Sequence, residues 1–93
     1  MSRFEEMKTF VRVVEAGSIS KAADQIGIAK SGVSRRLADL EQRLGVKLIN
    51  RTTRRSSLTE AGDMYYRGAV KLLGDVAELD TSVISEETRL QGT

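Results

Sequence analysis

The chain has 93 residues, 40% of them hydrophobic, which is enough for one small domain with a compact core. It contains no histidine, cysteine or proline, so disulfides, thiolate metal sites, a histidine-based triad and a histidine general base are excluded, and we expect no metal or cofactor. The net charge of +2 is divided unevenly, because residues 1–59 carry 12 Lys/Arg and 6 Asp/Glu, whereas residues 60–93 carry 3 and 7.

Three short helices are predicted from apolar spacing in the first half of the chain. The first covers about 4–16. The second covers about 21–26, with Ser20 as its N-cap and Gly27 opening a three-residue turn. The third covers about 30–44. Its predicted inner stripe is Val33, Leu37, Leu40 and Leu44.

A small hairpin and a long helix are predicted after these helices. Residues 46–50 form a β-branched run typical of a strand, and residues 57–59 are expected to return beside it. Thr59 is the expected cap of a fourth helix over about 60–87, whose first turn carries acidic residues that suit the helix dipole. The order predicts a mainly α fold: a winged helix-turn-helix of three helices and a two-stranded wing, followed by a long dimerisation helix.

The turn between the second and third helices carries the main functional signal. Ala23, Gly27 and Val33 have the spacing of two helices that cross steeply, which places a helix-turn-helix at about 19–38. A generic helical hairpin has the same features. The basic segment that follows favours DNA binding, because residues 30–55 hold 8 basic and 2 acidic residues.

The outer face of the third helix has the composition expected of a helix in a major groove. It carries Ser31, Arg35, Ala38 and Gln42, flanked by Ser34 and Asp39. Small residues allow close approach, and an arginine such as Arg35 can donate two hydrogen bonds to guanine O6 and N7. An ordinary solvated face is the alternative interpretation.

The predicted wing tip, residues 51–55, contains three arginines and two threonines. Arginine suits phosphates and narrow minor grooves, and either Arg51, Arg54 or Arg55 is able to enter a groove. Because phosphate contacts set the salt dependence of binding, Arg54→Ala is predicted to weaken binding to all sequences, whereas Arg35→Ala relaxes sequence preference.

The fourth helix carries a heptad-like seam with a 4-3-4-3-4 spacing. Its residues are Tyr65, Ala69, Leu72, Val76, Leu79 and Val83. A second, adjacent apolar stripe is able to pack on the three-helix body. We therefore expect the seam to pair two copies of the chain, with a single helix folded back on its own domain as the alternative.

Several runs of the chain closely resemble the N-terminal domain of LysR-type transcriptional regulators. They are residues 10–29, residues 33–55 and Leu58-Thr59-Glu60-Ala61-Gly62. The resemblance implies a homodimer of winged helix-turn-helix domains, paired through linker helices, that binds an interrupted palindrome near a promoter. Residues expected at DNA, several of them on that basis, are Ser20, Lys30, Ser31, Ser34, Arg35, Arg51, Thr52 and Arg54. Ala29 stands where relatives commonly carry a capping serine.

The expected organisation is a DNA-binding domain at 1–59, a dimerisation helix at 60–88 and the start of a hinge at 89–93. The resemblance implies an absent C-terminal effector-binding domain that senses a small molecule and joins dimers into tetramers. The N-terminus lacks the features of a signal peptide, and no segment is long and apolar enough for a membrane span, so we expect a cytoplasmic protein.

Three other classes of function are weighed against this one. A stand-alone dimeric repressor or antitoxin without a sensor would use the same DNA residues, and the length of the native gene product separates it. A helical module that binds an acidic protein would show no preference for promoter DNA. An enzyme would need more than Ser31 beside Lys30 or Ser34 beside Arg35, because these pairs have no third group and no convergent pocket.

Overall fold

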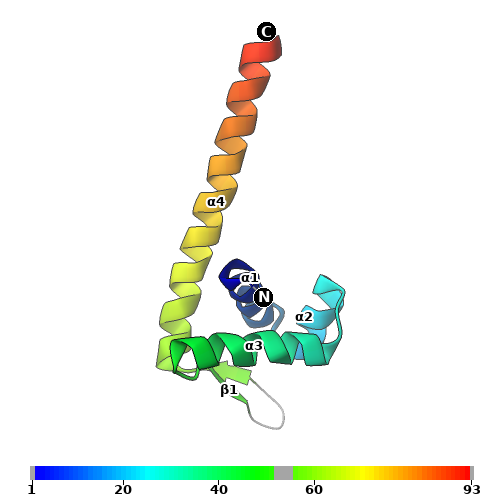
Figure 1. Cartoon of the computed structure of the whole chain (residues 1–93), viewed down its shortest axis with the longest axis vertical. Helices are drawn as coiled ribbons and strands as arrows, with labels where there is room; N and C mark the ends of the chain where they lie inside the picture. Colours follow the sequence, from blue (N-terminus) through cyan, green and yellow to red (C-terminus); the bar gives the residue numbers. More distant parts are fainter. Residues whose placement is uncertain (1, 52–55, 93) are drawn as a thin grey trace.

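A computed structural model describes residues 2–51 and 56–92. These residues form, in chain order, α1 (Arg3–Ala16), α2 (Ile19–Ile26), α3 (Lys30–Leu44), β1 (Ile49–Arg51), β2 (Ser56–Leu58) and α4 (Glu60–Gly92). The predicted fold class is confirmed: three helices form a compact body, a two-stranded hairpin lies beside α3, and α4 projects far beyond the body (Figure 1). The molecule measures 57 × 26 × 21 Å, with α4 along the longest dimension.

Helix starts follow the side chains available for capping. Ser18, in extended backbone, accepts a hydrogen bond from the Lys21 amide at 3.1 Å, so α2 begins at Ile19. The prediction of Ser20 as this cap was therefore wrong, because the helix starts two residues earlier and Ser20 lies within its first turn. At α3, Ala29 has no side-chain oxygen and makes no capping hydrogen bond.

The core lies where α1, α2 and α3 meet the start of the hairpin. Its buried hydrophobic residues are Phe10, Val13, Ala22, Ala23, Val33, Leu37, Leu40, Leu48 and Ile49. Three members of the predicted inner stripe of α3 are buried, whereas Leu44 is exposed, because the helix ends there at Gly45. The inner face of α3 is thus fixed by the core, and its opposite face is left at the surface.

The hairpin is shorter than its sequence pattern indicates. β1 and β2 are antiparallel, with Ile49 opposite Leu58 and Arg51 opposite Ser56. The first strand begins at Ile49 rather than at residue 46, because the amides of Val46 and Leu48 donate to the Glu41 carbonyl and side chain instead of to β2. The connection from α3 to the wing is therefore a bonded loop.

Helix α4 begins at Glu60, with Thr59 as its cap, as predicted. The Thr59 hydroxyl accepts from the Gly62 amide at 2.9 Å and donates to the Lys47 carbonyl at 2.7 Å. The helix extends to Gly92, beyond the predicted end at residue 87, so residues 89–92 are helical where a hinge was expected. Side-chain contacts one turn apart continue there, including Thr88 to the Ile84 carbonyl and Gln91 to Glu87. None of the helices in the described part of the chain is long and apolar enough to cross a membrane.

Candidate nucleic-acid interface

The exposed face of α3 carries most of the residues predicted to contact DNA. Lys30, Ser31 and Arg35 are exposed, and Ser34 is half-buried beside them. All four lie within the first two turns of the helix. They face outward because the buried stripe on the opposite side is fixed against the core. Ala38 and Gln42 continue the exposed face toward the C-terminal end. The structure thus brings the predicted groups of α3 together on one surface.

The remaining predicted DNA residues come from other elements. Ser20 is exposed near the start of α2, and Arg51 is exposed at the end of β1. Thr52 and Arg54 lie outside the described residues. The described part of the interface therefore consists of α3, the start of α2 and the base of the wing.

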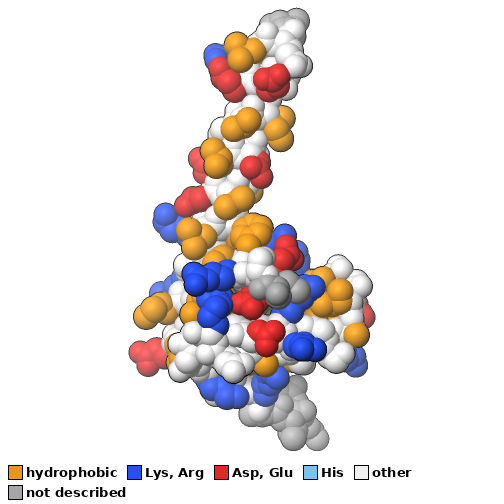
Figure 2. Space-filling model, in the orientation of Figure 1, with side chains coloured by type: hydrophobic (Ala, Val, Ile, Leu, Met, Phe, Trp, Pro, Cys, Tyr) orange, Lys and Arg blue, Asp and Glu red, His pale blue; other side chains and the backbone are white. Residues whose placement is uncertain are grey.

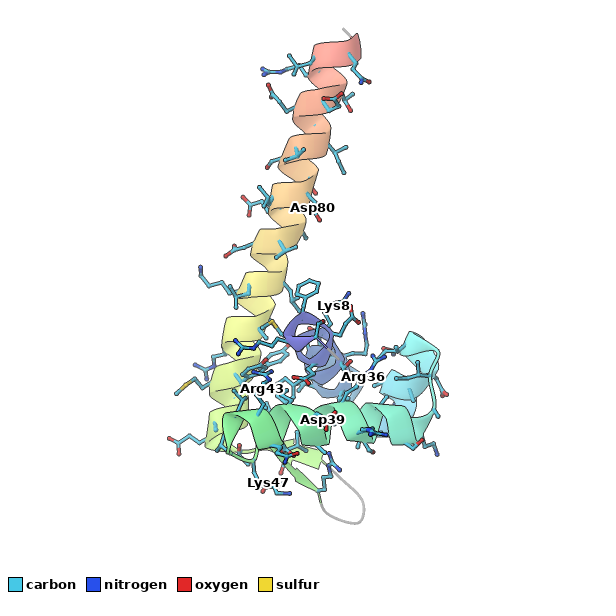
Figure 3. All side chains as sticks on the ribbon, in the orientation of Figure 1. Lys8, Arg36, Asp39, Arg43, Lys47 and Asp80 are labelled. Carbon is cyan, nitrogen blue, oxygen red and sulfur yellow. The ribbon has the colours of Figure 1, made fainter. Side chains whose placement is uncertain are left out.

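Lys47 is a candidate that the sequence analysis left out. It is exposed, and it lines one hollow together with Ala38 and Gln42 of the outer face of α3. Figure 3 shows Lys47 on the wing side of α3, whereas Arg36 and Arg43 lie on the side of α1. The sequence feature that could have identified Lys47 as a candidate is its place in the basic segment 30–55. In the folded chain, Lys47 lies between α3 and the wing.

Two other basic residues of α3 have roles within the body. Arg36 is half-buried and donates from Nη1 to the Thr9 hydroxyl at 3.1 Å. Arg43 donates from Nη2 and Nε to one oxygen of the buried Glu6, at 2.7 and 3.2 Å, and the hydrogen bond with Glu6 raises the Arg43 pKa. These two guanidinium groups hold α3 against α1.

The charges of the molecule are divided unevenly between the body and α4. Figure 2 shows both basic and acidic side chains over the body, with Lys and Arg at its edge beside the wing, whereas α4 shows hydrophobic side chains interspersed with acidic ones and a few basic ones. Acidic α4 residues that have basic partners include Asp63, bonded to Arg67 at 2.8 Å. The body therefore offers the surface suited to a polyanion.

The structure corrects the predicted seam of α4 at its first two positions. Ala69 is only 2% exposed, and Tyr65 packs on the core, with its ring edge-to-face with Phe10 at a centroid distance of 5.3 Å. Ala69 is covered and Tyr65 is partly covered by the chain's own body, because α4 packs on α1 there. The other four seam residues are 41–64% exposed: Leu72, Val76, Leu79 and Val83.

The model of the family described as "Bacterial regulatory helix-turn-helix protein, lysR family" matches residues 4–63. The chain belongs to this LysR family. The matched residues run from the start of α1 to the first turn of α4, and thus include the helix-turn-helix and the wing.

Relatives of this LysR-family chain are transcription regulators rather than enzymes. It is 48% identical over 88 residues to the HTH-type transcriptional regulator CrgA of Neisseria meningitidis. The alignment covers 95% of the chain but 29% of CrgA, so the chain spans less than a third of the length of this relative.

Solved structures of DNA-bound domains share the fold. The crystal structure of the BenM_DBD/catB site 1 DNA complex has a TM-score of 0.89, with 32% identity over 98% of both chains. The CbnR_DBD–DNA complex has a TM-score of 0.84, with 28% identity over 92% of this chain and 99% of that one. The chain thus has the architecture of LysR-type DNA-binding domains, the class of DNA-binding transcription regulators to which it belongs.

Proposed function

We propose that this LysR-family chain binds a two-fold symmetric promoter site as a homodimer, with α3 of each copy in a major groove and each wing at the flanking backbone. The observation that carries the proposal is the outward face of α3. Ser31 and Arg35 are exposed there, while the side chains behind them, such as Val33 and Leu37, are fully buried. A rigid helix with small residues and one long donor on its free face suits base-edge recognition.

Phosphate contacts are assigned to the groups around this face. Lys30 stands at the N-terminal end of α3, where the helix dipole adds to its positive charge. Lys47 and Arg51 flank the face on the wing side, and Thr52 and Arg54 are assigned to the same role from the sequence. Ser20, at the start of α2, is proposed to donate to the backbone from the opposite side.

The exposed part of the seam supports the dimer. This part of α4 projects beyond the three-helix body and carries exposed apolar residues at spacings of 4, 3 and 4: Leu72, Val76, Leu79 and Val83. No described element of the chain covers them, and a second α4 has the same repeat to offer in return. Two paired copies carry two reading heads, which a palindromic site requires.

We also propose that this chain is part of a longer protein with a further, C-terminal domain. The chain covers 29% of CrgA, so most of the length of this relative lies outside the matched region. We propose that a corresponding further domain senses a small-molecule effector and joins dimers into tetramers. The length of the native gene product distinguishes this proposal from the alternative of a stand-alone regulator without a sensor domain.

The experiment pairs a seam variant with a matched control on the same helix. Leu79→Glu places a charge in the seam, and Thr81→Glu places the same charge on the opposite side of α4. For both variants, sedimentation at micromolar concentration measures the oligomeric state. Titration of a fluorescent duplex, taken from the DNA upstream of the gene that encodes the chain, measures DNA binding. We expect the control to stay dimeric and bind the palindrome, and Leu79→Glu to become monomeric and bind only half-sites weakly. A monomeric parent chain, or equal binding to promoter and scrambled duplexes, overturns the proposal.

A further inference from the structure

Glu41, in the last turn of α3, accepts hydrogen bonds from four backbone amides of the segment that leads to the wing. Its main-chain carbonyl accepts from Gly45 at 2.8 Å and from Val46 at 3.2 Å. One oxygen of its side chain accepts from Leu48 at 2.8 Å and from Ile49 at 3.1 Å. One residue of α3, the helix proposed to read the major groove, thus accepts from almost every amide between the helix end and the first strand.

The main-chain bonds belong to an ordinary helix end. Gly45 has a φ of +72°, and the Val46 amide after it donates to the Glu41 carbonyl. A left-handed glycine with such a hydrogen bond is a common way to end an α-helix. The side-chain bonds are additional. They reach seven and eight residues along the chain, to amides that the helix end does not satisfy. The carboxylate therefore determines where the chain goes after the helix has ended.

The two amides held by the carboxylate belong to buried residues. Leu48 and Ile49 are 1% and 3% exposed, so their amides have little access to water. A buried amide without a partner costs free energy, and a bond to a charged acceptor is stronger than one to a neutral acceptor. Ile49 is also the first residue of β1 and is paired with Leu58 of β2. Fixing its amide fixes the base of the wing.

We propose that Glu41 is the positioning residue that sets the wing relative to the recognition helix. It acts on DNA through the hairpin that it holds, and it does not itself need to touch the duplex. The inference rests on the proposed DNA-binding function. Glu41 would thereby set the position of the wing contacts relative to the major-groove contacts. Its negative charge by itself would repel DNA, so net charge does not explain an acid at this place.

The test uses two variants and one charge control. Glu41→Ala removes the acceptor, whereas Glu41→Gln keeps an oxygen at the same reach and loses only the charge. Asp24→Ala removes one exposed carboxylate from α2 and serves as the control for net charge. If charge alone mattered, all three variants would bind DNA slightly more tightly than the parent chain.

Amide hydrogen exchange on the free protein is the first readout. In Glu41→Ala we expect the Leu48 and Ile49 amides to exchange at least about tenfold faster, with the amides of α1 and α3 unchanged and protection largely restored in Glu41→Gln. Unchanged exchange at both amides, or a uniform loss of protection over the whole body, overturns the proposal without any reference to DNA.

Hydroxyl-radical footprinting on the promoter duplex is the second readout, at protein concentrations that give equal occupancy. We expect Glu41→Ala to lose protection at the sugars flanking each half-site, to keep protection at its centre, and Glu41→Gln to recover the flanks. A footprint that weakens evenly, or that Glu41→Gln does not restore, overturns the positioning role. If the parent chain gives no footprint, the proposed function fails, while the exchange result still decides whether Glu41 holds the wing.

Discussion

Gly62 packs so closely against Leu48 that a Cβ atom at position 62 would lie 2.0 Å from the Leu48 carbonyl oxygen. The same oxygen accepts the Thr59 amide at 3.0 Å. The first turn of α4 therefore rests on the backbone that leads from α3 to the wing. Helix α3, the wing and helix α4 thus meet at one short segment, residues 46–49.

The first prediction follows from this contact. Gly62→Ala should destabilise the chain by about 1–3 kcal/mol, because the obstructing atoms are backbone and have no rotamer to change. Gly68→Ala is the matched control on the same helix. A Cβ there meets nothing within 4 Å, so alanine should stabilise α4 by about 0.5–1 kcal/mol. Urea unfolding monitored by circular dichroism measures both, and a neutral Gly62→Ala variant would contradict the contact.

The second prediction concerns the ion pair between the buried Glu6 of α1 and the partly exposed Arg43 of α3. Glu6→Gln should lower the free energy of unfolding by about 1–3 kcal/mol, because the buried charged acceptor of the Arg43 hydrogen bond is replaced by a neutral amide oxygen. Glu5→Gln, whose exposed carboxylate lies 3.6 Å from Lys8, should change it by no more than about 1 kcal/mol. Equal losses of stability in thermal denaturation of the two variants would show that the burial of Glu6 is unimportant.

The third prediction is a pH dependence at alkaline pH. Burial raises the pKa of Tyr65, and a hydrogen bond donated to Glu15 raises the pKa of Tyr66. Because both pKa values are higher in the folded state, the stabilisation is fully present below the ordinary value of about 10 and is lost as pH rises through the folded values.

Tyr65→Phe keeps the ring against Phe10 but removes the titrating hydroxyl, so its stability should fall less steeply above about pH 10 than that of the parent chain. Tyr66→Phe should remove the second part of the same dependence. Urea midpoints measured between neutral and strongly alkaline pH test this. Superimposable curves for the parent chain and the double variant would refute it.

The fourth prediction separates base contacts from phosphate contacts. Arg35→Ala should relax sequence preference by about 1–3 kcal/mol at one position in each half-site. Lys47→Ala should weaken binding to all duplexes alike and reduce the salt slope by about one per copy. Titrations of promoter and scrambled duplexes at several salt concentrations distinguish the two. Losses that are equal and independent of sequence in both variants would contradict the division of roles.

The fifth prediction uses the unequal capping of the two helices of the helix-turn-helix. Ala29→Ser supplies the oxygen that α3 lacks and should stabilise the chain by about 0.5–2 kcal/mol. Ser18→Ala removes the cap of α2 and should cost a similar amount. Calorimetric midpoints should therefore move in opposite directions. A shift of the same sign in both variants would mean that neither start is limited by its cap.

The sequence by itself determined the features that depend on neighbouring residues. The bounds of α3, the cap at Thr59 and the outward position of Arg35 follow from apolar spacing and side-chain chemistry within a few turns of one helix. The resemblance to LysR-type regulators likewise rests on contiguous runs, and the family match confirms it.

Only the tertiary structure decided what depends on residues far apart in the chain. Ala69 has the spacing of a seam residue, yet α1 covers it, because periodicity identifies an apolar face without identifying what packs on it. Glu41 reads as one more charged residue on a helix until the fold brings the amides of Leu48 and Ile49 to its carboxylate. Local spacing fixes a helix and its faces, whereas the partner of each face is set by the packing of the whole chain.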